Sequence, residues 1–247
     1  MTSTEHRIQL RRKDDEETAM DAWIQKLNET FIETGYYTLL LDGFKNTIII
    51  TAGALVIGLA IGVLIAVINE FSKEIPFLKP FAFLCKVYVT AIRGIPIVVL
   101  LLVFYYIILK STDGVIVGIL AFGFNSGAYM AELIRGGING VDKGQEEAAR
   151  SLGLSNLQTM RLIILPQATR YILPAIGNEF IALLKETSVA GYVAVVDLTR
   201  AGNLIRNNTY DATNPLLIVA AVYLIMVILL TQLLRVAERK LSEGYGN

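Results

Sequence analysis

Residues that commonly carry chemistry are scarce in this sequence. Its 247 residues include one histidine, His6, and one cysteine, Cys85. A single cysteine excludes a disulfide within the chain, and so few candidates argue against a metal site or a cysteine or histidine nucleophile. We therefore expect no catalytic residue, no metal site and no enzymatic activity, and we interpret Cys85 as a small apolar residue in the interior.

An excess of charge of either sign is also missing, since 22 Lys and Arg balance 22 Asp and Glu. No nucleic-acid partner is expected from such a balance. The phosphate-binding pattern G-x-x-x-x-G-K-[ST] does not occur, so any ATP that the protein depends on would be bound by a separate chain. Residues 1–17 are polar and lack the apolar core of a secretory signal peptide, and we expect a mobile tail there.

Apolar residues, in contrast, are abundant. They make up 54% of the chain, and the mean hydropathy of +0.54 is high for a soluble domain. Crossing about 30 Å of hydrocarbon takes about 20 apolar residues in a helix. Five transmembrane helices are predicted, at residues 44–68, 81–109, 115–138, 162–186 and 216–234. The sequence therefore predicts an all-α polytopic membrane protein.

Three regions are expected along the chain. Residues 1–43 combine the polar tail with an amphipathic helix at 18–41, which carries Trp23, Leu27 and Phe31 at helical spacing. We expect this helix to lie along the membrane; a soluble, tail-like helix is the alternative. Residues 44–241 form the transmembrane domain, and 242–247 a C-terminal tail. Between the last two spans, 189–215 is mixed in character and predicts a short helix and a loop.

Some residues within the spans predict local geometry. Gly58 and Gly62 form G-x-x-x-G, which we interpret as close packing inside the helix bundle rather than dimerisation. Pro96 removes a backbone donor and should bend or break the second span. The nearby Arg93 is costly in hydrocarbon, so it should either tie two helices together or contact a substrate.

Polar side chains in the third and fourth spans are candidates for a pathway. Asn125 and Ser126 lie near the middle of the third span, while Glu132 and Arg135 are spaced to pair with each other. Glu179 and Glu186 lie seven residues apart, so they share a helix face. Carboxylates there predict a site facing water or a cationic ligand. The alternatives are neutralisation by Lys185 or Arg170, or an interfacial position for Glu186.

A polar, helix-forming segment at 142–166 separates these two spans. Asp142 is placed to cap a short helix, Gly153 permits a close approach or a turn, and a second short helix follows from Ser155. Such a segment cannot lie in hydrocarbon, so we expect it on the membrane face. Its shape suits a projection that fits a groove on another protein.

This segment resembles the EAA loop of ABC importer permeases. The resemblance rests on Glu147-Ala148-Ala149, on Gly153, and on the run Ile163-Ile164-Leu165-Pro166 at the family's spacing. Further patterns are similar to the polar amino-acid branch of that family: Arg-Gly-x-Pro ending at Pro96, Ala-Tyr-x-Ala-Glu-x-x-Arg-Gly-Gly ending at Gly137, and the run from Gly177 to Ser188. Together they cover the chain from about residue 44 to residue 241.

The resemblance implies the type I permease fold, with five transmembrane helices and a cytoplasmic coupling helix. It implies partners as well: two cytoplasmic ATP-binding subunits that hold ATP and Mg, a second permease chain (identical or similar), and an external substrate-binding protein. Glu147, Ala148, Ala149 and Gly153 would couple to the ATPase. Glu179, Glu186, Asn125 and Ser126 would bind the substrate. That substrate would be a polar amino acid, with a basic one favoured and glutamine, glutamate and cystine left open.

Orientation and mechanism follow from the same resemblance. With the EAA loop in the cytoplasm of a prokaryote, five spans in the inner membrane place the N-terminus outside and the C-terminus inside. The positive-inside rule alone does not decide the orientation, because the basic residues at 7–13 would favour the opposite one. The implied mechanism is alternating access driven by the ATPase. An ion-coupled secondary amino-acid transporter is the alternative, although we find no pair of inverted repeats. A membrane scaffold would leave the aligned carboxylates unexplained.

Overall fold

The computed structural model describes residues 20–243, with side chains as far as residue 239. The predicted tail at 1–17 and most of the tail at 242–247 lie outside this range. Every regular element in the described range is helical, which agrees with the all-α prediction. The elements are η1 (Asn28–Glu33), α2 (Tyr36–Phe71), η2 (Pro76–Leu78), α3 (Lys79–Gly94), α4 (Ile97–Val103), η3 (Phe104–Ile108), α5 (Gly114–Asn139), α6 (Lys143–Ser151), α7 (Asn156–Thr159), η4 (Met160–Ile164), α8 (Leu165–Glu186), η5 (Thr187–Val193), α9 (Leu198–Thr209) and α10 (Asn214–Glu243).

The N-terminal helix of the described part covers residues 20–33, and its last part, η1, is a π-helix. The chain then turns at Gly35, whose φ of 75° is left-handed. α2 begins directly afterwards, at Tyr36. The amphipathic helix is therefore shorter than the predicted 18–41, and the first long helix begins before residue 44. The apolar residues after Tyr36 continue α2 because nothing interrupts their helical pattern.

Three helices are long and apolar enough to cross a membrane alone: α2, α5 and α10. The second predicted span is a broken pair, in which Pro76–Gly94 and Ile97–Ile108 are bent by 110°. Pro96 stands at this break beside an extended Ile95, so the predicted effect of the proline is confirmed. α8 has 22 residues, about 33 Å, but is less apolar than the three spans. The count of five crossings therefore stays a prediction.

Small residues bring α2 against α5. A Cβ atom added to Gly62 would lie 2.5 Å from the Cβ of Met130, and one added to Gly58 would lie 2.8 Å from Ser126. Real Cβ atoms do not approach other atoms so closely, which means that only glycine permits this helix separation. The G-x-x-x-G pattern thus packs inside the chain, as predicted.

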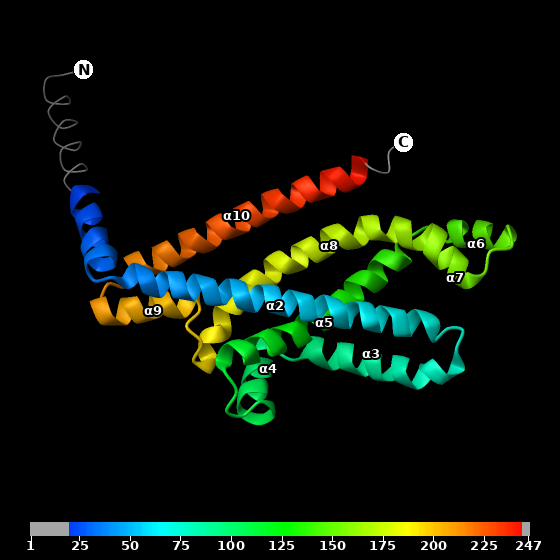
Figure 1. Cartoon of the computed structure of the whole chain (residues 1–247), viewed down its shortest axis with the longest axis horizontal. Coiled ribbons are helices and arrows are strands. Elements are labelled where there is room, and N and C mark those ends of the chain that lie inside the picture. Colours follow the sequence, from blue (N-terminus) through cyan, green and yellow to red (C-terminus); the bar gives the residue numbers. More distant parts are fainter. Residues whose placement is uncertain (1–19, 244–247) are drawn as a thin grey trace, which may run out of the picture.

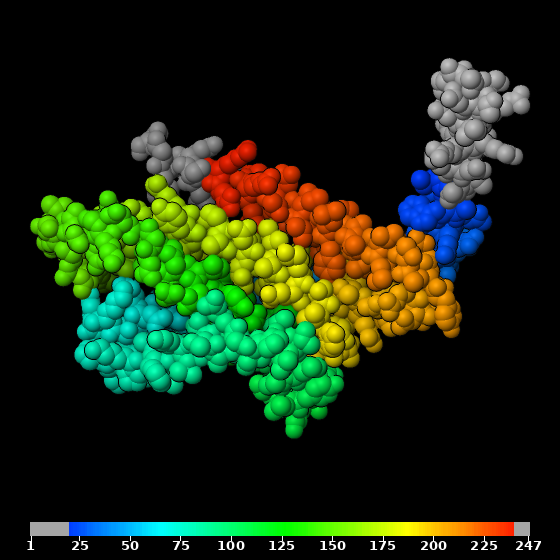
Figure 2. Space-filling model, turned by 180° about the vertical axis from the view of Figure 1, so that it is seen from behind, coloured from blue at the N-terminus to red at the C-terminus, as the bar shows by residue number. Residues whose placement is uncertain are grey.

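Different helices lie at the two ends of the molecule. Figure 1 shows α6 and α7 at one end, beside the loop that joins α2 to α3. The helix at 20–33 and α9 lie at the opposite end. α8 returns from the α6–α7 end to the α9 end, and it packs beside α10 on the face shown in Figure 2. The helices thus connect two polar ends through an apolar middle.

Candidate functional site

Two adjacent residues of α5 pair with the two carboxylates of α8. The Ser126 hydroxyl donates to Oε1 of Glu179 over 3.3 Å. The Asn125 side-chain amide donates to Oε2 of Glu186, also over 3.3 Å. All four residues of the predicted substrate site therefore come together at one helix interface. The shared face of Glu179 and Glu186, predicted from their spacing, is the face of α8 that meets α5.

The α5 side of this contact is buried, whereas the α8 side is partly exposed. Asn125 and Ser126 are almost fully buried, at 3% and 0% exposed. Gly58 of α2 packs directly behind Ser126, so the serine has no room to turn away. Glu179 and Glu186 are only partly buried. Neutral donors thus fix the two carboxylates from behind, while part of each side chain stays accessible.

A threonine pair extends the polar contact beyond Glu186. The hydroxyls of Thr51 in α2 and Thr187, the residue after Glu186, lie 3.5 Å apart, and both side chains are fully buried. The sequence did not single out this pair. A threonine in an apolar helix carries little signal, since its hydroxyl can bond to its own backbone, as both do here.

The other membrane carboxylate, Glu132 in α5, is already paired. Oε2 of Glu132 lies 2.5 Å from Nη2 of Arg135 and 3.7 Å from Nη1 of Arg93. The Arg93 guanidinium also lies over the ring of Tyr129, 5.2 Å from its centre. The predicted pairing of Glu132 with Arg135 is confirmed. Arg93 ties α3 to α5, as one of its two interpretations proposed.

The predicted coupling segment forms two short helices at the end of the molecule. The Asp142 carboxylate accepts from the backbone of Gly144 over 2.7 Å and so caps α6. Ser155 and Gln158 form a capping box that starts α7. Between the helices Gly153 adopts a φ of 84° with open space where a Cβ would be. Glycine therefore suits the left-handed turn here, and no atom of the described residues approaches it closely.

The side chains of the coupling segment divide between inside and outside. Glu147 and Ala148 are exposed, whereas Ala149 is 4% exposed and packs within the chain. Leu152 is 83% exposed at the turn between the two helices. Leu152 is not among the residues that were predicted from the sequence to couple to the ATPase.

Comparisons with known proteins identify the family to which this sequence is similar. Residues 58–243 match the family described as the binding-protein-dependent transport system inner membrane component. The probable glutamine ABC transporter permease protein GlnM of Bacillus subtilis is 35% identical, over 85% of this chain and 96% of GlnM. The arginine transport system permease protein ArtQ of the same organism is 34% identical, over 83% and 93% of the two chains.

A solved structure agrees with the sequence relatives. It belongs to an amino acid ABC transporter with histidines, is 38% identical, and superposes with a TM-score of 0.76 over 84% of this chain and 96% of its own. The family match covers far more than half of the sequence and includes the segment that resembles an EAA loop. This chain is a membrane-embedded ABC importer permease and belongs to the family of inner membrane components of binding-protein-dependent transport systems.

Proposed function

We propose that this permease carries polar amino acids, basic ones among them, into the cell. Relatives of closely similar length are named for glutamine and for arginine transport, and the similar solved structure is an amino acid transporter. The contact between α5 and α8 supports the same substrate class. Glu179 and Glu186 provide two carboxylates that accept hydrogen bonds from the neutral side chains of Ser126 and Asn125.

The observation that carries this proposal is the fixed pair of carboxylates. A carboxylate that accepts one neutral hydrogen bond keeps lone pairs for a further donor. An ammonium or guanidinium group would form charge-assisted hydrogen bonds there, which are shorter and stronger than neutral ones. Glu179 and Glu186 would hold the cationic group of the amino acid, while Asn125 and Ser126 would position the carboxylates. This assignment extends to the α-ammonium group of any amino acid.

Transport would be driven from the α6–α7 end. Two ATP-binding subunits in the cytoplasm, holding ATP and Mg, would receive Glu147, Ala148 and the turn at Gly153 in a groove, with Ala149 supporting the helix from inside. A second permease chain would complete the pathway, and an external binding protein would deliver the amino acid at the α9 end. ATP binding would favour the outward-facing arrangement through its differential affinity for that arrangement.

The test is uptake by the permease reconstituted with its ATPase, comparing Glu179→Gln with the parent chain. The variant keeps the shape and the bond to Ser126 but removes the charge. We expect arginine uptake to fall by about tenfold, the effect of losing about 1.4 kcal/mol of binding, with the ATPase still co-purifying. Glu33→Gln, which changes an exposed carboxylate outside the long helices, is the control. Unchanged uptake of every amino acid would give Glu179 a structural role, and uptake without ATP would favour ion coupling.

A further inference from the structure

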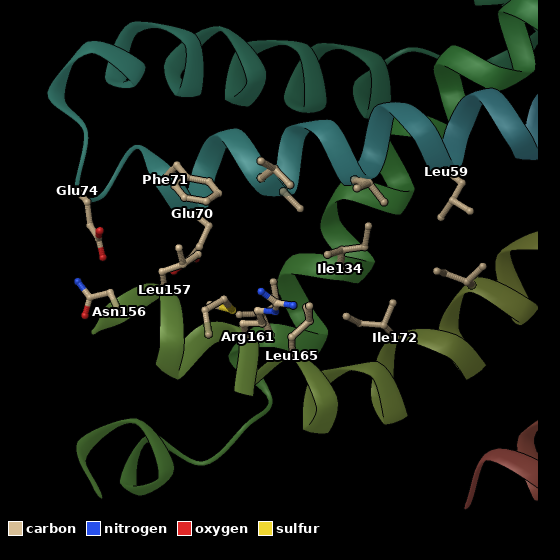
Figure 3. A pocket seen from close by; sticks show the side chains of 16 residues that line it. Leu59, Glu70, Phe71, Glu74, Ile134, Asn156, Leu157, Arg161, Leu165 and Ile172 are labelled. Atoms are coloured by element: carbon tan, nitrogen blue, oxygen red, sulfur yellow. The ribbon is translucent and has the colours of Figure 1, made fainter. Parts of the chain in front are cut away.

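A cavity of about 450 Å³ opens between α2, α5 and the first half of α8, away from the α5–α8 carboxylates. Its walls are mainly aliphatic, with Leu59 from α2 facing Leu165 and Ile172 from α8 (Figure 3). Val63 of α2 also lines the cavity. Leu59, Val63 and Leu165 are all more than a third exposed. The cavity is therefore a lateral groove with an accessible apolar lining, and not a closed part of the core.

Polar groups lie at one end and near the middle of this groove, and the opposite end is apolar. Figure 3 shows Glu74 and Asn156 at that end, pointing toward one another. Arg161 lies farther along, and Leu59 and Ile172 close the apolar end. Arg161 and Glu74 are exposed, and neither takes part in the ion pairs found within residues 20–243. Passing inward, the groove thus presents the Glu74 carboxylate, then the Arg161 guanidinium with Phe71 and Leu157 between the two, and then an aliphatic end.

The position of the groove relates this order to the membrane. Its apolar part follows α2, one of the three helices able to span a bilayer. Its polar end lies where α2 passes into the charged loop before α3, beside α7. From Leu59 to Phe71 α2 rises about 18 Å. One leaflet contributes about half of the 30 Å hydrocarbon thickness, so the groove matches the depth of a single leaflet.

We infer that this groove binds a phospholipid with an ethanolamine headgroup. The acyl chain would lie along Leu59, Val63 and Ile172, the phosphate would meet the Arg161 guanidinium, and the terminal ammonium would meet the Glu74 carboxylate. A glycerophospholipid places ammonium, phosphate and hydrocarbon in this same order from water inward. A guanidinium matches the geometry of a phosphate in particular.

Glu74 should make the groove selective among lipid headgroups. The ammonium of ethanolamine carries three hydrogen-bond donors, which the Glu74 carboxylate can accept, whereas the neighbouring Glu70 already bonds to Lys73 over 2.6 Å. A choline headgroup keeps the positive charge but has no N–H donor. A glycerol headgroup leaves a net negative charge, which Glu74 repels, since Glu70 is paired with Lys73. The phosphate is common to all three lipids, so Arg161 should contribute to the binding of each of them.

The experiment titrates the purified chain in detergent with phosphatidylethanolamine, phosphatidylcholine and phosphatidylglycerol of identical acyl chains, and counts bound lipid by native mass spectrometry. We expect phosphatidylethanolamine to bind about tenfold more tightly than the other two. Arg161→Gln should weaken the binding of all three lipids, whereas Glu74→Gln should remove the preference by weakening phosphatidylethanolamine more than phosphatidylcholine. Arg235→Gln and Glu238→Gln, on α10 outside the groove, are the matched controls.

Three results would overturn the inference. Equal binding of the three lipids by the parent chain would remove the role of Glu74. Unchanged binding in Arg161→Gln would place the lipid elsewhere on the surface. A change in the dimer population of Arg161→Gln, without a change in bound lipid, would show that a second copy of this chain occupies the groove instead. Near-ultraviolet circular dichroism of each variant establishes that it is folded, so a loss of binding can be assigned to the groove.

Discussion

At the scale of single residues, Asp211 joins the helix at 20–33 to the loop before α10. Its carboxylate accepts from the backbone of Thr213 over 3.0 Å and from the Asn214 side chain over 2.7 Å. Lys26 lies 3.3 Å from it, and Trp23 donates to the side-chain oxygen of Asn214 over 2.8 Å. The only tryptophan of the chain therefore reports on this junction.

This junction should weaken in acid. Burial raises the pKa of Asp211, but hydrogen bonds from Thr213, Asn214 and Lys26 outweigh it, so the pKa lies below its ordinary value. A carboxyl group whose pKa is depressed by folding stabilises the folded state above its unfolded pKa of about 3.9. That stabilisation is lost as the pH falls through the folded pKa. We expect the Trp23 fluorescence to change below about pH 4, measured in the purified chain.

The variant Asp211→Asn tests the origin of that change. Its fluorescence at neutral pH should resemble that of the parent chain in acid, and it should respond little to pH. Glu29→Gln is the matched control, because Glu29 lies on the same helix but bonds only to Gln25 among the described contacts. An acid transition that persists undiminished in Asp211→Asn would assign the transition to another group.

The residues of the candidate site could be named from sequence, but their pairing could not. A spacing of seven places Glu179 and Glu186 on one helix face by periodicity alone. Their partners are 53 and 61 residues away in sequence, and the register between two helices depends on packing that no local pattern encodes. The close approach of Gly58 to Ser126 is one such determinant.

At the scale of elements, a proline predicted a helix end correctly, whereas a glycine within an apolar pattern did not. Pro96 predicted the break between α3 and α4, because a proline cannot donate the helical hydrogen bond. The end of the first helix at Gly35 was missed, since apolar residues continue at helical spacing on both sides of it. A glycine in such a pattern is compatible with either a helix or a left-handed turn.

The turn at Gly153 yields a prediction about the coupling segment. Its φ of 84° costs an alanine about 1–2 kcal/mol, so Gly153→Ala should distort the angle between α6 and α7. We expect the amount of co-purifying ATPase to fall about fivefold, which corresponds to about 1 kcal/mol. Gly153→Asn should lose less, because asparagine tolerates the left-handed region.

The control for this turn is Gly136→Ala. Gly136 lies inside α5 and has open space at its Cβ position, so the same change in side chain carries no left-handed strain. Full ATPase recovery with Gly153→Ala would show that the backbone of the turn does not determine docking. In that case the exposed Leu152 becomes the residue to vary next.

At the scale of the whole molecule, hydropathy and geometry give different counts of crossings. α8 is less apolar than the spanning helices because it carries charged residues such as Glu179 and Glu186. It nevertheless connects the α6–α7 end to the α9 end, as Figure 1 shows. α5 and α10 shield one side of it, so its polar face need not meet lipid. A helix that lines a pathway can therefore cross a membrane with a weak hydropathy signal.

Labelling from one side of the membrane tests this topology. In a Cys85→Ser background, which removes the only native cysteine, single cysteines replace Leu152 and Tyr210, which are 83% and 95% exposed. They lie at the two opposite ends of the molecule. In intact cells an impermeant maleimide should label Tyr210→Cys almost completely and leave Leu152→Cys unlabelled. Leu152→Cys should be labelled once the cells are permeabilised, because α8 separates the two positions across about 30 Å of hydrocarbon. Labelling of both from the outside would mean that α8 does not cross, and the reverse pattern would invert the orientation while leaving the five crossings intact.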